Sequence, residues 1–497
     1  MGYAKRRKRD NKGRIINVGN SERRLIASFL SFWASLLVVM AIWNSAYADD
    51  GNGVEYHDTE IKVGLYFTDA QKNIYNAVSS FEIYAEKGLE LGYKNGDEFV
   101  VLLKTGDKSV LTISKGELPA QDDDTQQNYD KKGIAVKSSI SDAADVFGSE
   151  NGIFQIRPNS TNDPYIFNLN GKNYRGFLEI RRLEGSDMTL INVLPLEEYL
   201  YGVVPCEMVW KSHPEALKAQ AVVARTYAYG NMGKYAKLGF DVCNTVLSQV
   251  YKGYDVEKDT TNKAVDDTRD EMVYYNGAIA QVFYFSSSGG RTEAAKNVWS
   301  YDAPYLQSVE DKYESGESPN YNWEKLLDST YISDRMISMG NNIGEISGVK
   351  ISKKTDAGRA LEMIITGTKG EVILEKSRCR DILGFPSQWF DIATDADVMI
   401  LDHTGGKNPA TRIQLAGKTV ITSKGSSIIG TGKSVCLLAA DGIKTEVPST
   451  PEMYTFTGKG YGHAVGMSQE GAKGMAEAGF GYKEIISHYF AGTHVDY

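Results

Sequence analysis

The stretch VVPCEMVWKSHPEALKAQAVVARTYA, residues 203–228, joins an apolar run to an alanine-rich segment through a single acid, Glu207. Ser212 and Glu215 have the S-x-x-E spacing of a capping box, Pro214 falls in the first turn and Gly230 follows the last periodic residue. These signals predict a helix over about residues 212–230. One face of this helix carries mostly small side chains, which lets neighbouring backbone approach closely: Ala216, Leu217, Gln220, Ala221, Ala224 and Ala228.

Glu207 lies in apolar surroundings, since it follows Pro205 and precedes Met208 and Trp210. Burial raises the pKa of a carboxyl group, and a carboxyl that stays protonated near neutral pH can act as a general acid. The local sequence by itself favours the commoner role of a surface or capping glutamate.

The rest of the chain predicts an α+β fold with a mixed, β-rich core. Alternating runs such as IKVGLYF (61–67) and MTLINVLPLEEYLYGVV (188–204) are typical of strands, and residues 340–440 alternate strands with glycine turns. A glycine-rich loop near the carboxyl end precedes two predicted helices, 468–478 and one that ends at 490. We expect a small β-rich accessory region at 49–160, with a possible role in wall binding, and a main domain at 165–497.

The first 48 residues have the composition of an export segment. A basic run is followed by the uncharged segment Leu25–Trp43, and Ala46 and Ala48 form the small-x-small pattern of a cleavage site. This uncharged, mostly apolar run of 19 residues also approaches the length that spans a bilayer, with the basic end held in the cytoplasm. A cleaved signal peptide and an uncleaved membrane anchor both stay open, and both place residues after 48 outside the cytoplasm.

Charge and cysteine content narrow the function classes. Residues 1–48 carry nine Lys/Arg against two Asp/Glu, a net +7 that leaves −16 for the remainder of a chain whose total is −9. Such an acidic domain lacks the basic surface that nucleic-acid backbones require. The four cysteines have no paired spacing, so we expect free thiols, with one bridge between Cys206 and Cys243 as the alternative.

Three further motifs suggest chemistry. Lys218 and Arg225 are two helical turns apart and share a face, where Arg225 could bind a carboxylate or a substrate; a solvated basic face is the alternative. SSSGG (286–290) lacks the G-x-S-x-G form of a nucleophile turn. His463 lies in a glycine-rich loop that allows backbone to approach a ligand, and the histidines show no metal-binding spacing.

Four segments together resemble the stage II sporulation protein D and amidase enhancer (SpoIID/LytB) family: LPLEEYLYGVVPCEM (194–208), HPEALKAQAVVARTYA (213–228), SSSGGRTEAAKNVWSYDAPYLQSV (286–309) and GYGHAVGMSQEGAKGMAEAGFGYKEIISHYFAGT (460–493). The resemblance covers roughly 165–495 in the family order. It implies a peptidoglycan lytic transglycosylase that cleaves the MurNAc–GlcNAc bond and leaves a 1,6-anhydro-MurNAc end, with a setting in sporulation and engulfment beside a cell-wall amidase.

By this resemblance Glu207 matches the catalytic glutamate of the family. When the 6-hydroxyl of the sugar attacks, one carboxyl can protonate the leaving oxygen and then deprotonate that hydroxyl, whereas ordinary glycosidases need two carboxylates. The resemblance also implies the following residues as the lining of the substrate site: Lys218, Gln220, Arg225, Gln249, Tyr251, Ser287, Ser288, His463, Ser468 and Gln469.

The sequence departs from the family at a zinc cluster that precedes a Q-V-Y motif in metal-bound members. Cys243 is kept, but Lys237, Leu247 and Ser248 occupy the other three positions. One soft ligand cannot close a tetrahedral site, so we predict neither zinc nor any other cofactor. The second functional hypothesis is a non-catalytic amidase enhancer that binds the wall and stimulates an N-acetylmuramoyl-L-alanine amidase.

Overall fold

The computed structural model describes residues 59–117, 132–139, 144–149, 151–159, 164–182, 187–400, 411–423, 425–430, 432–438, 442 and 444–497. All of them belong to the unit His57–Tyr497. The predicted export segment of residues 1–48 lies outside the described residues. Within the described part of the chain, no helix is long and apolar enough to span a bilayer.

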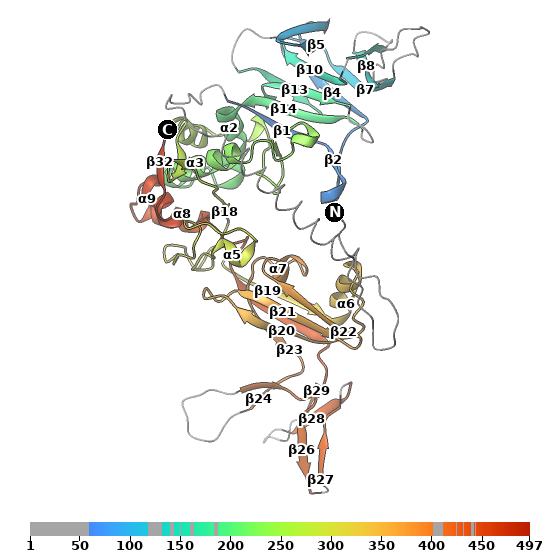
Figure 1. The fold of residues 1–497 in the computed structure, drawn as a ribbon, viewed down its shortest axis with the longest axis vertical. Coiled ribbons are helices and arrows are strands. Elements are labelled where there is room, and N and C mark those ends of the chain that lie inside the picture. The colour runs from blue at the N-terminus through green and yellow to red at the C-terminus, as the bar shows by residue number, and fades with distance from the viewer. Residues whose placement is uncertain are drawn as a thin grey trace, which may run out of the picture. The chain divides into compact units, whose positions relative to one another are not determined.

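The first large sheet has the strand order β15-β1-β14-β13-β10-β5-β6 (Figure 1). Its neighbours are antiparallel except for β15, which runs parallel to β1. The central strand β14 is buried along almost its whole length, as expected for a strand covered on both faces. The strands are β1 (Glu60–Tyr66), β5 (Leu89–Asn95), β6 (Glu98–Lys104), β10 (Ile153–Pro158), β13 (Phe177–Arg181), β14 (Thr189–Pro195) and β15 (Val242–Cys243).

The second large sheet has the order β12-β11-β4-β7-β8-β9. Its strands are β4 (Ser80–Tyr84), β7 (Leu111–Glu117), β8 (Lys132–Ser138), β9 (Ala144–Phe147), β11 (Ile166–Leu169) and β12 (Lys172–Arg175). Strands from both sides of the predicted boundary at 160–165 are hydrogen-bonded within each large sheet. Neither large sheet is therefore built from residues 60–158 alone, and a role of this region in wall binding stays a prediction.

The prediction of a strand over 188–204 is wrong for its carboxyl half, because β14 ends at Pro195 and helix α2 (Leu196–Glu207) begins at the next residue. Leu196, Tyr199, Leu200, Val203 and Val204 are all buried. Their separations of one, three and four residues put them on one helical face. The alternating pattern of the preceding strand, β14, had obscured this helical periodicity. Glu207 thereby becomes the last residue of a helix.

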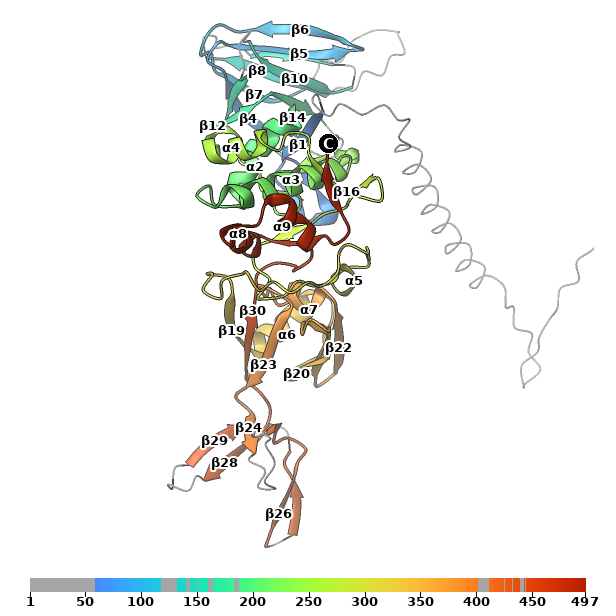
Figure 2. The same cartoon turned by 90° about the vertical axis from the view of Figure 1, so that its left-hand side faces the viewer.

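Helix α3 (Pro214–Gly230) confirms the predicted alanine-rich helix, with its cap moved by one residue. His213, not Ser212, is the N-cap, and its side chain accepts a hydrogen bond from the Glu215 N–H. Helix α3 contacts α2 and α4 (Asp259–Asp266) on one side and α8 (Gln469–Glu477) and α9 (Tyr482–Tyr489) on the other (Figure 2). The predicted small face thus serves close helix packing, and the two predicted carboxyl-terminal helices are confirmed.

Residues 322–459 form a further set of sheets between the third and fourth motifs. A three-stranded sheet, β19-β30-β23, uses β19 (Asn322–Asp328), β23 (Trp389–Thr394) and β30 (Met453–Lys459). Another contains β20 (Ile346–Lys354), β21 (Ala360–Gly367) and β22 (Gly370–Glu375), and α6 (Ser329–Ser338) and α7 (Arg378–Asp381) pack on these strands. Three hairpins follow: β24 (Asp397–Ile400) with β25 (Thr411–Gln414), β26 (Thr419–Thr422) with β27 (Gly425–Ile428), and β28 (Ser434–Leu438) with β29 (Lys444–Pro448).

Short elements connect the remainder. They are β2 (Thr68–Asp69), β3 (Ile74–Tyr75), β16 (Met272–Tyr275), β17 (Ala278–Ile279), β18 (Tyr284–Phe285), α5 (Ala295–Val298), β31 (Met467–Ser468) and β32 (His494–Asp496), with 3-10 turns at Ala70–Lys72, Ala236–Leu238 and Tyr254–Val256. The parallel pairing of β18 with β31 brings the third and fourth sequence motifs together. Helices and strands are mixed throughout, so the predicted α+β fold class is confirmed.

Candidate functional site

Glu207 is half-buried at the carboxyl end of α2. One of its carboxyl oxygens accepts a hydrogen bond of 3.0 Å from the Val250 N–H. Burial raises the pKa of Glu207, while the Val250 N–H and the side chains of Tyr284 and Gln469 act in the opposite direction by hydrogen-bonding its charged form. Among the described residues, no lysine or arginine forms an ion pair with Glu207.

Tyr284 is oriented toward Glu207 by Gln249. The Gln249 amide donates to the Ala224 carbonyl at 3.2 Å and to the Tyr284 hydroxyl at 3.1 Å, while its oxygen accepts from the Tyr199 hydroxyl at 3.2 Å. Because the Tyr284 oxygen already accepts a hydrogen bond, its own proton is available to Glu207. Burial raises the pKa of Tyr284 well above its usual value and the Glu207 charge adds to this, so the phenol stays a donor.

Gln220 and Gln469 complete this group from two other helices. The Gln469 amide nitrogen donates to the Gln220 oxygen at 3.2 Å, across 249 residues of sequence. Gln220 is fully buried, and its own amide nitrogen has no hydrogen-bond partner within the described structure. The candidate site therefore joins Glu207, Gln220, Gln249 and Gln469 of the predicted residues to Tyr284, and it leaves the buried amide nitrogen of Gln220 without a partner among the described residues.

Arg225 does not lie with this group. Its guanidinium is fully buried and makes a bidentate ion pair with Glu197, at 2.6 and 2.7 Å. It also donates to the Val265 and Glu271 carbonyls. Because the Arg225 side chain has no exposed surface, we assign it to the packing of α2 on α3 instead of to substrate binding.

Lys218 and Tyr251 also make contacts that differ from those predicted. Lys218 forms ion pairs with Glu215 at 3.2 Å and Asp267 at 3.5 Å, which fits the alternative of a charged helix face. Tyr251 is buried and donates to Asn192 of β14 at 2.8 Å. A Cβ at Gly202 would lie 2.5 Å from the Tyr251 ring, so this glycine allows α2 to pack against the tyrosine.

Ser287 and Ser288 are buried, and both hold an acid that the sequence motifs did not indicate, Glu314. Ser287 donates its hydroxyl proton to one Glu314 oxygen. The other oxygen accepts from the Ser288 hydroxyl at 2.6 Å and from the Ser288 and Gly289 N–H groups at 3.0 Å. The two serines therefore stabilise a turn, and their side chains have no surface with which to bind substrate.

The same turn is held from the other side by Arg359 of the 322–459 segment. This fully buried guanidinium donates to the carbonyl groups of Ser288, Arg291 and Thr292, at 2.7, 2.5 and 3.2 Å. Neither Glu314 nor Arg359 lies in a recognisable motif, so only the tertiary contacts reveal them.

His463 and Ser468 flank the candidate site. His463 lies among the rings of Phe283, Phe285 and Trp299, and burial together with the Arg380 charge lowers the pKa of His463 to about 3. A neutral imidazole follows, whose Nδ1 accepts from the Val465 N–H at 3.1 Å. Ser468 is the N-cap of α8 and accepts from the Gly471 N–H at 3.1 Å, which fixes the orientation of Gln469 in the first turn.

Sequence reasoning missed Tyr284 because an aromatic strand residue is most often part of the core. The available signal was its position, two residues before the SSSGG turn that the third motif contains. Tyr199 and Tyr227 were missed because aromatic residues of helices are also most often part of the core. Burial raises the pKa of both tyrosines, and the charge of Glu207 contributes to this.

Cys243 lies in a hydroxyl environment: Thr245, Ser248 and Tyr235 contact its sulfur at 3.3, 3.5 and 3.6 Å. Within the described residues, no group of three or more His, Cys, Asp or Glu side chains has the arrangement of a metal site. The four cysteines are free thiols, so the alternative of a Cys206–Cys243 bridge is wrong.

Comparisons with known proteins agree with the four motifs. A family model described as "Stage II sporulation protein" (SpoIID) matches residues 184–275, which include Glu207 and α3. The chain is 31% identical over 352 residues to the "Amidase enhancer" of Bacillus subtilis, covering 68% of this chain and 46% of that protein.

Two other relatives are matched over more of their length. An uncharacterized protein of Brachyspira hyodysenteriae is 31% identical over 333 residues, 67% of this chain and 74% of the relative. The "Stage II sporulation protein D" of Bacillus subtilis is 29% identical over 317 residues, 61% of this chain and 74% of the relative. The chain thus spans less than half of the amidase enhancer and about three quarters of the other two. With the sequence motifs and these matches together, the chain belongs to the stage II sporulation protein D and amidase enhancer family.

Proposed function

We propose that the chain is a peptidoglycan lytic transglycosylase in which Glu207 is the single acid and base. In this reaction the Glu207 carboxyl protonates the oxygen that leaves the MurNAc C1 atom. The resulting carboxylate then removes the proton from the 6-hydroxyl of the same sugar as that oxygen attacks C1. The products are a GlcNAc end and a 1,6-anhydro-MurNAc end, and Glu207 has its proton back.

The observation that carries this proposal is the environment of Glu207. Burial raises the pKa of Glu207, which favours the protonated form that must act first. Hydrogen bonds from the Val250 N–H and Tyr284 then favour the carboxylate that remains after the proton has left. Groups that stabilise charge as it develops are the ones that accelerate a reaction.

The absence of a second carboxylate from these interactions also supports the single-acid reaction. The groups that shift the pKa of Glu207 are a backbone N–H, a tyrosine and a glutamine, together with burial. Glu314 is occupied by the Ser287–Gly289 turn. A hydrolase that uses water would need a second carboxyl group facing the same bond.

The proposal includes the setting. The basic, apolar and small-residue pattern of residues 1–48 supports export, either with a cleaved signal or with an uncleaved anchor. The substrate is the glycan strand of the wall, in sporulation or in engulfment, and a cell-wall amidase is the proposed partner. No cofactor takes part.

The second candidate is a non-catalytic enhancer that binds the wall and stimulates an amidase. The observation that favours it is the relative named "Amidase enhancer", to which this chain is 31% identical. Under this function Glu207 would contribute to binding or to structure, and its proton would be irrelevant.

One experiment separates the two candidates. The full chain, its Glu207→Gln variant and the control Glu371→Gln, which changes an exposed acid of β22, are incubated with glycan strands freed of peptides. Mass spectrometry of the products should show 1,6-anhydro ends with the wild type and the control, and a loss of about 100-fold or more with Glu207→Gln. Absence of anhydro product from the wild type, or equal product from Glu207→Gln, would contradict catalysis. Stimulation of a purified amidase that survives Glu207→Gln would favour the enhancer.

A further inference from the structure

A polar cavity lies against α2, and Glu207 is not among the residues that line it. Its volume is about 430 Å³, within the range of small-molecule sites. Glu198, one of its lining residues, precedes Glu207 by nine positions in the same helix. Nine residues are two and a half helical turns, which places the two carboxyl groups on opposite faces and roughly 13 Å apart along the axis.

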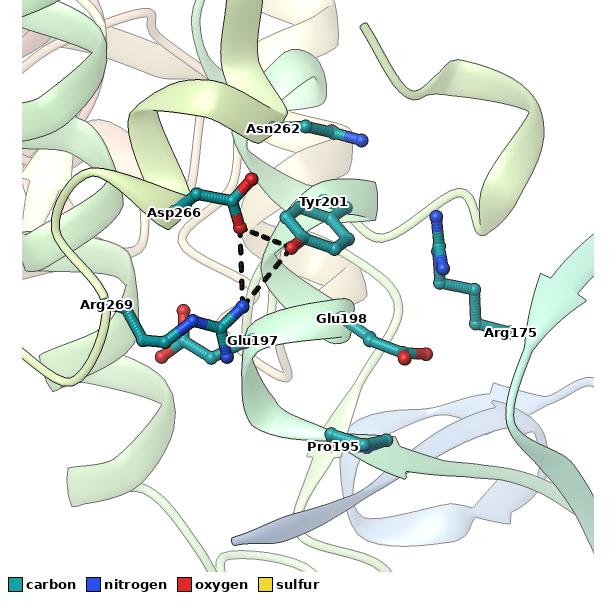
Figure 3. Close-up of a pocket in the computed structure, with 8 residues that line it drawn as sticks. All are labelled: Arg175, Pro195, Glu197, Glu198, Tyr201, Asn262, Asp266 and Arg269. Atoms are coloured by element: carbon teal, nitrogen blue, oxygen red, sulfur yellow. Dashed lines mark hydrogen bonds and ion pairs between the residues drawn. The ribbon is translucent and has the colours of Figure 1, made fainter. Parts of the chain in front are cut away.

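Two guanidinium groups from different elements border this cavity (Figure 3). Arg175 of β12 is held by a bidentate ion pair with Glu257, at 2.6 and 2.9 Å, and lies 5.2 Å from the Tyr201 ring. Arg269 follows α4 and contacts Asp266 at 3.3 Å and the Tyr201 hydroxyl at 3.5 Å. Figure 3 shows the two arginines on opposite sides of Tyr201 and Glu198. Their positions are therefore set before a ligand arrives.

Carboxylates balance the arginines in the same cavity. Glu198 and Asp266 both line it, and Tyr201 donates to Asp266 at 2.5 Å. The third lining acid, Glu197, is neutralised by its buried ion pair with Arg225. A polyanion such as a phosphate chain would meet these acids, and an apolar ligand would leave charged groups without solvent. The lining fits a ligand that carries both charges.

Asn262 adds a requirement for a donor. Its amide nitrogen is bound to Glu257 at 2.8 Å, which turns the amide oxygen away from that acid. This oxygen is buried and has no hydrogen-bond partner within the described residues. A buried acceptor without a partner is unfavourable, and a ligand N–H that reached it would remove this cost.

We propose that this cavity binds a free amino acid or a dipeptide in its zwitterionic form. The ligand carboxylate lies on the guanidinium groups of Arg175 and Arg269. Its ammonium group lies on Glu198 and Asp266, and an N–H of the ligand meets the Asn262 oxygen. The site is separate from the one proposed for glycan cleavage and does not depend on that function.

The test is a calorimetric titration of the full chain with three matched dipeptides and one sugar. Dialanine carries both charges, N-acetyl-dialanine lacks the ammonium and dialanine amide lacks the carboxylate. We expect dialanine to bind at least about tenfold more tightly than either blocked form, since each blocking group removes one charge-assisted contact. Equal affinity for the three dipeptides, no dialanine binding, or tighter binding of N-acetylglucosamine would each overturn the proposal.

Two variants locate the binding. Glu198→Gln should remove the advantage of dialanine over N-acetyl-dialanine, whereas Glu371→Gln, distant in β22, should leave all four affinities unchanged. Preserved discrimination in Glu198→Gln would place the binding elsewhere and overturn the assignment. The dipeptide series on the wild type keeps the proposal falsifiable if Glu198→Gln fails to fold, and none of these measurements depends on glycan cleavage.

Discussion

The Val250 N–H lies 3.0 Å from a carboxyl oxygen of Glu207, which it follows by 43 residues. This contact connects the end of α2 to the loop that also carries Gln249, and Gln249 in turn orients Tyr284. A backbone donor, a phenol and a glutamine thus converge on one half-buried acid from three separate segments. The predictions below test the energetics of this convergence and of the helices that support it.

Removing the Tyr284 hydroxyl should raise the pKa of Glu207. The hydrogen bond from Tyr284 favours the charged carboxylate, so Tyr284→Phe leaves the protonated form more stable. In a general-acid reaction, the alkaline limb of the pH–rate profile then moves to higher pH, and the maximal rate falls by about tenfold or more because the carboxylate loses a donor. The measurement is the pH dependence of anhydro-product formation, with Tyr331→Phe on the exposed side of α6 as the control. An unchanged alkaline limb would contradict a direct contact.

Glu207 should make the folded protein less stable as pH rises. Its pKa is raised by burial, so the folded state holds this proton more tightly than the unfolded state. Stability is unaffected below the unfolded pKa and decreases as pH rises from there to the higher folded pKa, by about 1.4 kcal/mol for each unit between them. Glu207→Gln should therefore gain stability relative to the wild type at pH 7.5 but not at pH 3.5. Urea unfolding at the two pH values measures this, and a Gln variant that is less stable at pH 7.5 would reverse the sign.

Breaking the Arg225–Glu197 pair should be costly, whereas replacing both partners should cost far less. Both side chains are buried, and the ion pair is bidentate. Arg225→Met leaves an uncompensated carboxylate in the interior and should destabilise the protein by about 3–5 kcal/mol. The double variant Arg225→Met with Glu197→Leu should recover most of that loss in denaturant unfolding. If the double variant were as unstable as the single one, the ion pair would not be the source of the effect.

A methyl group at Gly471 should disrupt the packing of α8 against the hydrogen-bonded pair of Tyr489 and Asp311. A Cβ there would lie 2.1 Å from the Tyr489 hydroxyl and 2.2 Å from an Asp311 oxygen. Gly471→Ala should therefore cost about 1–3 kcal/mol by overpacking. Gly230→Ala is the matched control, since a Cβ at this helical glycine meets nothing within 4 Å and should be neutral or stabilising by up to about 1 kcal/mol. A similar thermal midpoint for both variants would show that this packing can relax.

Local signals predicted the elements whose stability is local. These signals act within one or two helical turns, so the predicted and observed helix ends agree to within about one residue. They are the capping residues and small face of α3, the N-cap Ser468 of α8 and the glycine break before α9. The pattern failed at 196–207, where alternation and helical periodicity overlap and the burial of five apolar side chains decided for a helix. The boundary predicted near 160 does not separate the two large sheets, because strands from its two sides pair with partners that are far away in sequence and that no local pattern shows.

The sequence by itself determined the family, the α+β class and the position of one acid a few residues before an alanine-rich helix. The tertiary structure decided which of the predicted side chains accompany Glu207, and it added Tyr284 to them. Gln220, Gln249, Tyr284 and Gln469 belong to separate elements whose convergence follows from packing, while Arg225, Ser287 and Ser288 are taken up by Glu197 and Glu314. A motif records residue types along the chain. The hydrogen bond between Gln220 and Gln469 forms only when α3 packs against α8, because the two residues are far apart in sequence and only this packing brings their side chains together.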